Sequence, residues 1–276
     1  MLLDTLSAYE RVKIARGKDR PKIDHYIDAL FDDFIELKGD RLGGEDAGIL
    51  GGIAMYHGKP VTVIGHRKGT TLEENMKYNF GMPEPEGYRK ALRLMKQAEK
   101  FGRPVITFID TPGAYPGIEA EENGQSIAIA ESLAQMSALK IPIIAVVTGE
   151  GNSGGALAIS VANSILMFEN AVYSILSPEG FASILWKDSE RSEEACDLMK
   201  MTAFNLKDYG LIDEIIPEPD GGILESSKKA FVVLDRMLQK ELAKYEHMSG
   251  ERLARHRYHK FRTLDSAHGK IKRGMR

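Results

Sequence analysis

The chain has 276 residues, of which 43% are hydrophobic and 28% charged, a composition typical of a folded globular protein and of neither a disordered nor a fibrous one. Thirty-seven basic against forty acidic residues give a net charge of -3, which argues against wholesale nucleic-acid binding. The one cysteine, Cys196, excludes an internal disulfide and a cysteine-rich zinc site. No apolar run approaches the roughly 20 residues that span a bilayer, and residues 1–13 lack the apolar stretch of a signal peptide. We therefore expect a cytoplasmic protein without a membrane or nucleic-acid partner.

The first forty residues are predicted to form a helical lead-in. Ile23, Ile27, Leu30, Phe31 and Phe34 form one apolar face at helical spacing. Three strand-like runs follow, at residues 47–56, 61–65 and 105–109. The segment between the second and third runs is predicted to contain a polar loop at 68–79 and an amphipathic helix at 85–101.

The second half of the chain repeats this order of elements. We predict a helix at 123–139, a strand at 141–148, an alanine-rich helix at 156–162, and strand-like runs at 171–176 and 211–216. Because apolar strands alternate with helices, we expect an α/β fold with a mainly parallel, buried sheet and helices outside it. The active groups of such folds lie in the loops at the strand ends.

We predict a single domain over residues 1–276. Its core spans 45–222, after the lead-in at 1–40 and before a helical, basic tail at 223–276. From residue 251 onward the tail carries nine Lys or Arg residues against two acidic ones, a net charge of +7.

Two loops rich in glycine are the candidates for chemistry. Residues 111–117 combine two glycines with two prolines in a rigid turn that exposes backbone N–H groups. Residues 149–155 run directly into a predicted helix, whose first N–H groups and positive dipole end favour an anion. Close packing of helix on strand is an alternative explanation for Gly154 and Gly155.

The second loop also matches the G-x-S-x-G pattern of a hydrolase nucleophile elbow, with Ser153 as the nucleophile. That mechanism requires a histidine base. The histidines after Ser153 lie in or beside the charged C-terminal stretch, where a solvated face is the better interpretation: His247, His256, His259 and His268. We therefore keep a serine hydrolase as the alternative function.

The chain closely resembles the alpha-subunit family of bacterial acetyl-CoA carboxylase carboxyltransferases. Five segments carry the resemblance: GHRKGTTLEENMKYNFGMPEPEGYRKALRLM (65–95), ITFIDTPGAYPG (106–117), GEGNSGGALAI (149–159), SPEGFASILWKD (177–188) and LIDEIIPEPDGG (211–222). It covers nearly the whole chain from about residue 11. Asn152 departs from the pattern, because the family usually has glycine there.

The resemblance implies the crotonase-like (ClpP/crotonase) fold, a spiral of repeated β-β-α units with a mainly parallel sheet and helices at both ends. It also implies a reaction in which negative charge develops on substrate oxygens, so that backbone donors matter more than a side-chain triad. The residues expected at the catalytic centre are Gly154 and Gly155, as oxyanion donors, with Gly113 and Ala114. Those expected to bind biotin or substrate are Tyr115, Gly117, Gly151, Asn152, Ser153, Arg67 and Lys68.

The same resemblance implies several partners. Biotin is expected on a carrier protein and not on this chain, which is expected to hold no metal. A zinc-bearing beta subunit completes the site, in an α2β2 complex that works with biotin carboxyl carrier protein, biotin carboxylase and acetyl-CoA or malonyl-CoA. The basic tail is then a solvated helix, a contact with the nucleotide end of coenzyme A, or a docking strip for another subunit, which we favour. A non-catalytic scaffold that only docks the carrier is a further alternative.

Overall fold

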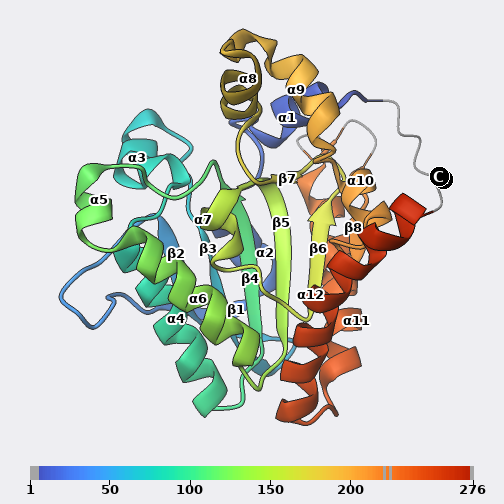
Figure 1. Ribbon diagram of the computed structural model, residues 1–276. Helices are drawn as coiled ribbons and strands as arrows, with labels where there is room; N and C mark the ends of the chain where they lie inside the picture. Colours follow the sequence, from blue (N-terminus) through green and yellow to red (C-terminus); the bar gives the residue numbers. More distant parts are fainter. Residues whose placement is uncertain (1–5, 220–221, 224–225, 274–276) are drawn as a thin grey trace.

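Eight strands form one sheet at the centre of the chain (Figure 1). The computed structural model describes residues 6–219, 222–223 and 226–273, with side chains described up to residue 264. Across the sheet the strand order is β1-β2-β3-β4-β5-β6-β8, and β7 pairs with the end of β5. The strands are β1 Asp32–Glu36, β2 Ile49–Tyr56, β3 Lys59–His66, β4 Val105–Thr111, β5 Ile143–Asn152, β6 Ser164–Phe168, β7 Val172–Ser174 and β8 Glu214–Ile216.

Most of the sheet is parallel, as the sequence predicted. β1, β2 and β3 are joined antiparallel, whereas β3, β4, β5, β6 and β8 all run parallel to their neighbours. The β2–β3 hairpin turns at His57 and Gly58, whose φ angles of 47° and 75° are those of the turns that close such hairpins. Every residue of β4, β5 and β6 is buried, which is expected of strands covered on both faces. The α/β class is thereby confirmed.

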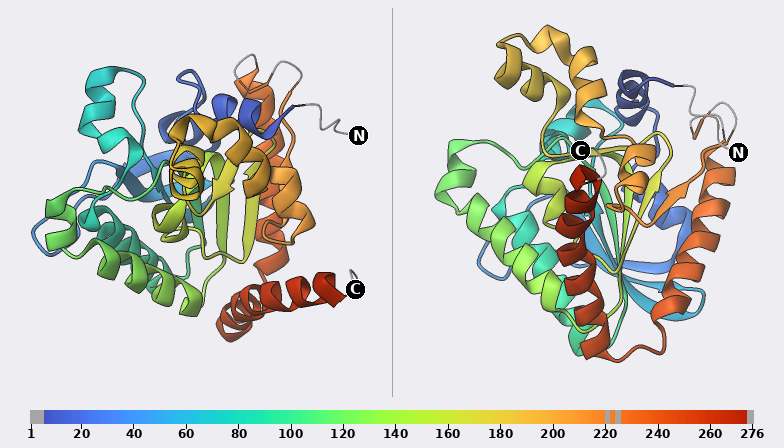
Figure 2. Two further views of the ribbon diagram at one scale, coloured as in Figure 1. Left: turned by 45° about the horizontal axis from the view of Figure 1, so that its top comes forward. Right: turned by 45° about the vertical axis from the view of Figure 1, so that its right-hand side comes forward.

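Helices cover both faces of the sheet (Figures 1 and 2). α4 and α6 pack together on one face, and α2 and α11 on the other. The ring of Tyr26 in α2 lies 5.3 Å from that of Phe108 in β4 and 5.2 Å from that of Phe231 in α11. The helices are α1 Ala8–Ala15, α2 Ile23–Leu30, α3 Leu72–Lys77, η1 Asn79–Gly81, α4 Pro85–Lys100, α5 Ile118–Glu122, α6 Gln125–Ala138, α7 Ser153–Leu157, α8 Pro178–Trp186, η2 Ser189–Arg191, α9 Ser192–Met199, α10 Ala203–Asp208, α11 Ser227–Tyr245 and α12 Gly250–Arg273.

α1, α8 and α9 stand together beyond the carboxyl ends of the central strands, at the top of Figure 1. Val12 and Ala15 of α1 share a small apolar cluster with Val172, Cys196 and Met201. Cys196 is therefore a buried packing residue, and burial raises the pKa of its thiol to about 11. This cluster fixes the N-terminal segment close to the strand ends.

Two predicted elements in the first half of the chain are wrong in part. The lead-in helix ends at Leu30, and Phe34 lies in β1. This strand can approach β2 because Gly52 has no side chain: a Cβ there would lie 2.1 Å from Ile35 O. The predicted polar loop at 68–79 contains α3, which begins with a capping box in which the Thr71 side chain accepts a hydrogen bond from Glu74 N.

The predicted helix at 156–162 is also displaced. α7 begins three residues earlier, at Ser153, and ends at Leu157. The chain turns back after it, and Asn163 N donates to Ile143 O (2.8 Å) at the start of the pairing between β5 and β6. β6, at residues 164–168, was not predicted. The predicted helix ends directly before it, and the apolar run that remains is too short to indicate a strand by its pattern.

Part of the basic tail serves the core. Arg257 of α12 is completely buried, and its Nη1 donates to Ile141 O (3.0 Å) and to Asn163 Oδ1 (2.5 Å). Lys260 pairs with Asp213 and also donates to Asn163 O (3.3 Å). Both side chains therefore lie against groups of this chain and do not belong to a free docking strip.

A buried ion pair ties the N-terminal segment to the sheet. Arg20 Nη2 lies 2.7 Å from Glu218 Oε1, and both side chains are at most 1% exposed. Arg20 Nε donates to Thr148 O in β5 (2.6 Å), and Glu218 accepts from Asn170 Nδ2 (2.9 Å). Burial by itself would raise the pKa of Glu218, but Arg20 outweighs burial and holds that pKa below its usual value of 4.5.

We predict that Glu218→Gln lowers the free energy of unfolding by roughly 3–5 kcal/mol, because it leaves Arg20 charged and unpaired in the interior. Urea unfolding at pH 7, followed by circular dichroism, measures the change. Since the native pKa of Glu218 is lowered, the stabilisation exists above pH 4.5 and is lost as the pH falls further. The difference between the two proteins should therefore shrink at acid pH. Equal stability at pH 7 would contradict the assigned role of this pair.

Candidate active site

Two loops that contain glycine leave the carboxyl ends of the neighbouring strands β4 and β5. The first, residues 111–117, is closed by Thr111, whose Oγ1 accepts from Gly113 N (3.0 Å) and donates to Gly113 O (2.7 Å). Gly113 has a φ of 146°, which residues with a side chain rarely adopt. The second loop is shorter than predicted, because β5 continues to Asn152 and α7 begins at Ser153, whose φ is 59°.

The two loops touch at Gly155. A Cβ on Gly155 would lie 2.6 Å from both Ala114 N and Gly113 C, so only glycine permits this approach. His66, at the end of β3, holds the same residue: its Nδ1 accepts from Asp110 N (3.4 Å), so its Nε2 carries the proton and donates to Gly155 O (3.2 Å). Burial lowers the pKa of His66 to about 4, and the ring is therefore neutral at physiological pH.

The backbone amides of Gly154 and Gly155 have no hydrogen-bond partner in the described part of the chain. They lie in the first turn of α7, where N–H groups have no acceptor within the helix. A Cβ on Gly154 would meet Ile129 of α6 at 3.4 Å, a contact that needs only slight adjustment. Close packing therefore explains the glycine at 155 but not the one at 154. Two adjacent free donors at the start of a helix provide a suitable environment for an oxyanion.

A buried charge network lies beneath the second loop. Lys68 Nζ donates to Asp110 Oδ1 (2.6 Å), and the same oxygen accepts from Glu150 N (3.1 Å). Burial by itself would raise the pKa of Asp110, but Lys68 and Lys22 hold it below its usual value, so the carboxylate is ionised. Arg16, just after α1, joins the network through Glu150 Oε1 (2.9 Å). The network connects the ends of three strands to the N-terminal segment.

Asn152, the residue that departs from the resembled family, belongs to this network. It is fully buried; its Nδ2 donates to Glu150 Oε1 (3.0 Å), and its Oδ1 accepts from Ser174 Oγ of β7 (2.7 Å). Glycine has no side chain for either bond. Asn152 therefore links β5 to β7 directly before the free amides.

Most of the other predicted site residues lie at the two loops, but Arg67 does not. Arg67 pairs with Asp24 (2.6 Å), and its guanidinium lies 4.8 Å from the centre of the Tyr78 ring. The Tyr115 ring lies directly against Gly117, where a Cβ would be only 2.4 Å from it. Arg67 therefore forms its ion pair with Asp24 and not with a residue of the two loops. The predicted residues that do lie in or beside the two loops are Gly113, Ala114, Tyr115, Gly117, Gly151, Asn152, Ser153, Gly154, Gly155 and Lys68.

Ser153 lacks the partners of a nucleophile. It is exposed, and within the described chain no histidine nitrogen hydrogen-bonds its hydroxyl. His66, which touches the same loop, uses both ring nitrogens on backbone groups. His256 packs against Tyr245 in the C-terminal part of the chain. The geometry therefore does not support a nucleophile elbow.

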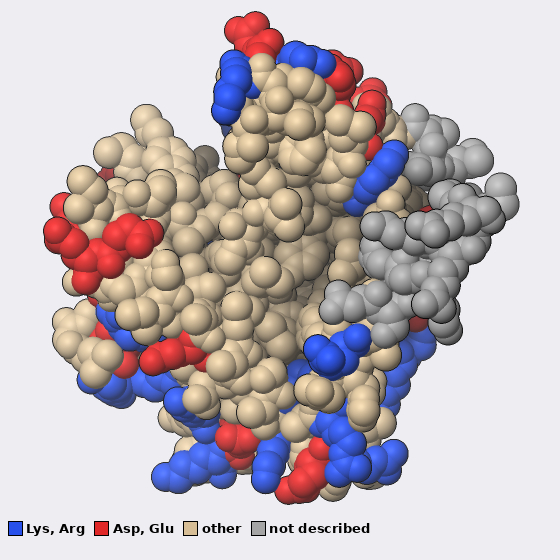
Figure 3. Space-filling view, viewed as in Figure 1, with Lys and Arg blue, Asp and Glu red and all other residues tan. Residues whose placement is uncertain are grey.

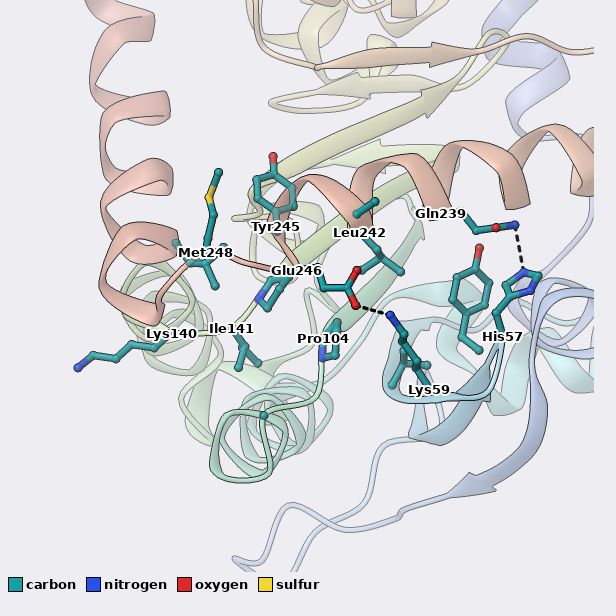
Figure 4. A pocket seen from close by; sticks show the side chains of 16 residues that line it. His57, Lys59, Pro104, Lys140, Ile141, Gln239, Leu242, Tyr245, Glu246 and Met248 are labelled. Carbon is teal, nitrogen blue, oxygen red and sulfur yellow. Dashed lines mark hydrogen bonds and ion pairs between the residues drawn. The ribbon is translucent and has the colours of Figure 1, made fainter.

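A cleft of 230 Å³ opens beside the charge network, and its lining includes Lys22, Lys68, Pro112 and Glu150. A larger cavity, of 470 Å³, lies at the amino ends of β3, β4 and β5, between α11 and the start of α12. Figure 4 shows this larger cavity, where Lys59 pairs with Glu246 across a mainly apolar floor. No residue of the two glycine loops lines it. Of these two cavities, only the smaller cleft adjoins the glycine loops.

Two further properties concern the described residues only. None of their His, Cys, Asp and Glu side chains form a group of three that is arranged to hold a metal ion. None of their helices combines the length and the apolar character needed to cross a membrane.

Sequence reasoning missed His66, Arg16 and Lys22. His66 directly precedes the predicted pair Arg67 and Lys68 at a strand end, and this position was a usable signal. Arg16 lies 134 positions before its partner Glu150, and no spacing rule connects residues so far apart. The N-terminal segment was predicted only as a lead-in, so its cations were not considered for the site.

Comparison with known proteins identifies the family. The chain matches the family described as acetyl co-enzyme A carboxylase carboxyltransferase-like over residues 1–265. It is 56% identical over 258 residues to the acetyl-coenzyme A carboxylase carboxyl transferase subunit alpha of Clostridium botulinum (strain Eklund 17B / Type B), covering 94% of each chain. The protein of that name from Geobacillus kaustophilus is 54% identical over 259 residues, which are 94% of this chain and 80% of the relative.

Solved structures show the same fold. Transcarboxylase 12S superposes on 84% of this chain with a TM-score of 0.68 and a sequence identity of 18%. The beta subunit of P. aeruginosa geranyl-CoA carboxylase superposes on 87% of this chain with a TM-score of 0.63 and a sequence identity of 14%. The chain spans only 43% and 46% of those two chains, so the likeness concerns the fold alone. The predicted crotonase-like fold is confirmed. Because the family match covers almost the whole sequence and the relatives are more than half identical, the chain belongs to the alpha-subunit family of acetyl-CoA carboxylase carboxyltransferases.

Proposed function

We propose that the chain is the alpha half of a biotin-dependent carboxyltransferase, which transfers the carboxyl group of carboxybiotin to acetyl-CoA and forms malonyl-CoA for fatty acid synthesis. One observation carries the proposal. The free amides of Gly154 and Gly155 are held against the loop at Gly113 and Ala114 by a contact that only glycine permits. Family membership supports the same reaction class.

The amides stabilise charge that develops on a substrate oxygen. Both N–H groups lie in the first turn of α7, whose dipole adds positive potential at this position. Loss of one such donor typically lowers the rate by on the order of 10²–10³. His66 holds the Gly155 carbonyl and so orients the donors before the substrate binds. No side-chain nucleophile is needed for this role.

The surroundings of the amides fit the uncharged ring system of biotin. Carboxybiotin, carried on a separate protein, supplies the carboxyl group. Ala114 and Ile129 form an apolar cluster with Tyr88 beside the amides. The buried hydroxyl of Tyr88, which has no hydrogen-bond partner among the described residues, would lie 3.0 Å from a Cβ on Gly155.

A zinc-bearing beta subunit completes the site by docking on the face that carries the amides, in an α2β2 complex. The centre of this face has few charged side chains, which gather at its edges (Figure 3). Helices α5 to α8 carry large apolar residues that are exposed: Ile118, Ile127, Leu157, Ile184 and Leu185. Exposed apolar area of this kind is typical of stable subunit interfaces. Biotin carboxyl carrier protein and biotin carboxylase supply the carboxylated biotin.

The first test is the reverse reaction, the formation of acetyl-CoA from malonyl-CoA and a free biotin derivative. We expect turnover from a mixture of this chain with a zinc-bearing beta subunit and none from either chain alone. Coupled detection of acetyl-CoA measures it, and complex formation is checked by size-exclusion chromatography. A complex that forms without turnover would refute the proposal.

A matched pair of glycine variants tests the donor geometry. Gly155→Ala should lower kcat by on the order of 10²–10³, because its Cβ would push against the backbone at 113–114 and displace a donor. Gly154→Ala should stay within about tenfold of the wild type, since its Cβ meets only the Ile129 side chain and both amides remain. Steady-state kinetics of the complex compares the two. Equal effects of both variants would contradict the assigned geometry.

Ser153→Ala separates carboxyl transfer from hydrolysis. The change keeps every backbone donor but removes the only hydroxyl available to a nucleophile elbow, so carboxyl transfer should persist within about tenfold. The same variant and the wild type are assayed with a p-nitrophenyl ester. An esterase activity that disappears with Ser153, together with lost carboxyl transfer, would restore the hydrolase alternative.

A further inference from the structure

Lys22 carries a buried ammonium group without a carboxylate partner. The residue is 6% exposed, and its Nζ makes one hydrogen bond, to Gly17 O at 3.3 Å. Its neighbours Arg20 and Lys68 pair with acids, but no carboxylate of the described residues forms an ion pair with Lys22. An ammonium group has three donors, and burying it unpaired is strongly unfavourable. The described chain therefore satisfies the donors of this ammonium group only in part.

Lys22 is one of the residues that line the 230 Å³ cleft beside the glycine loops. Lys68 and Arg16 line it too, but Asp110 and Glu150 already neutralise them. Burial lowers the pKa of Lys22, whereas the charge of Asp110, which forms no ion pair with it, acts in the opposite direction. An anion bound in the cleft would supply the direct ion-pair partner that Lys22 lacks among the described residues.

The cleft adjoins both parts of the candidate active site. Pro112 in its wall belongs to the first glycine loop, and Glu150 lies in β5 shortly before the free amides. Its volume is below the roughly 300–1,000 Å³ of pockets that enclose a whole small-molecule ligand. It is therefore suited to one charged group of a larger substrate whose remainder lies outside.

We propose that Lys22 and Lys68 form a subsite for an oxyanion of the acyl-CoA substrate, either the carboxylate that is transferred or a phosphate of coenzyme A. This rests on the carboxyl-transfer function proposed above and adds a binding role for the N-terminal segment. Lys68 donates to Asp110 and retains two further N–H donors, and Lys22 contributes an ammonium group that forms no ion pair within the described chain. Both side chains are positioned before the anion binds.

Lys22→Met and Lys68→Met form a matched pair for stability. Methionine fills a similar volume without charge, so Lys22→Met should leave the melting temperature unchanged or raise it. Lys68→Met should lower it, because the buried Asp110 loses its direct partner. Differential scanning fluorimetry of the chain measures both. A clear loss of stability in Lys22→Met would assign Lys22 to structure and overturn the proposal.

Kinetics of the alpha–beta complex test the substrate and identify the anion. Lys22→Met should lower kcat/KM for malonyl-CoA by about 10- to 100-fold, as expected for loss of one hydrogen bond to a charged group. If the subsite holds the carboxylate, Lys22→Met should lower kcat/KM for malonyl-pantetheine, which lacks the nucleotide phosphates, by the same factor. If the subsite holds a phosphate, Lys22→Met should lower kcat/KM for malonyl-CoA only. Lys59→Met, at the opposite end of the sheet, is the control and should leave kcat/KM for both substrates unchanged. Unchanged kcat/KM for both substrates would refute the subsite.

Anion binding to the chain alone keeps this test independent of turnover. At constant ionic strength, malonate or pyrophosphate should raise the melting temperature of the wild type more than that of Lys22→Met. If the complex shows no turnover but this difference persists, the proposed reaction is wrong and the anion subsite stands. Equal shifts in both proteins would overturn the subsite whatever the activity.

Discussion

The contact between Gly155 and the backbone at Gly113 and Ala114 is the constraint on which the site depends. Parallel pairing of β4 with β5 brings both loops to the same edge, but their approach is possible only because position 155 has no Cβ. His66 then holds the Gly155 carbonyl from β3. The free amides of α7 owe their position to these three neighbouring strands, and for this reason the site needs no mobile side chain to present a donor.

Charges buried around these loops connect distant parts of the chain. Arg16, Arg20 and Lys22 all come from the segment between α1 and α2, and each lies at the carboxyl ends of the central strands. Arg20 forms an ion pair with Glu218, whereas Lys22 forms none among the described residues. We expect the first charge to stabilise the fold and the second to lower its stability. Residues that break a local rule in this way are expected at functional sites. The N-terminal segment thus places charges beside the two glycine loops and is not only a lead-in.

The two ends of the sheet differ in their surroundings. At the amino ends, buried Arg257 and the Lys260–Asp213 pair attach α12 to the core. At the carboxyl ends, the face that carries α7 has few charged side chains at its centre and exposed apolar residues on α5 to α8 (Figures 1 and 3). Exposing such a surface to water is unfavourable, and a low density of charges is typical of the centre of a protein–protein interface. Membership of an alpha-subunit family agrees with a surface that another subunit covers.

By itself the sequence determined the family, the α/β class with its mainly parallel sheet, and the two glycine loops at strand ends, because periodicity and long motifs are local patterns. It placed α4 and most central strands well, and it led to errors at Phe34, α7 and β6, where long-range pairing outweighs local preference. The single domain and the roles of the site residues stay predictions. Only the tertiary structure decided that Gly155 is needed for packing and Gly154 is not, that Asn152 ties β5 to β7, and that Arg67 is engaged elsewhere while Lys22 faces the cleft. The physical reason is that packing, burial and charge pairing join residues more than a hundred positions apart, which no spacing in the sequence records.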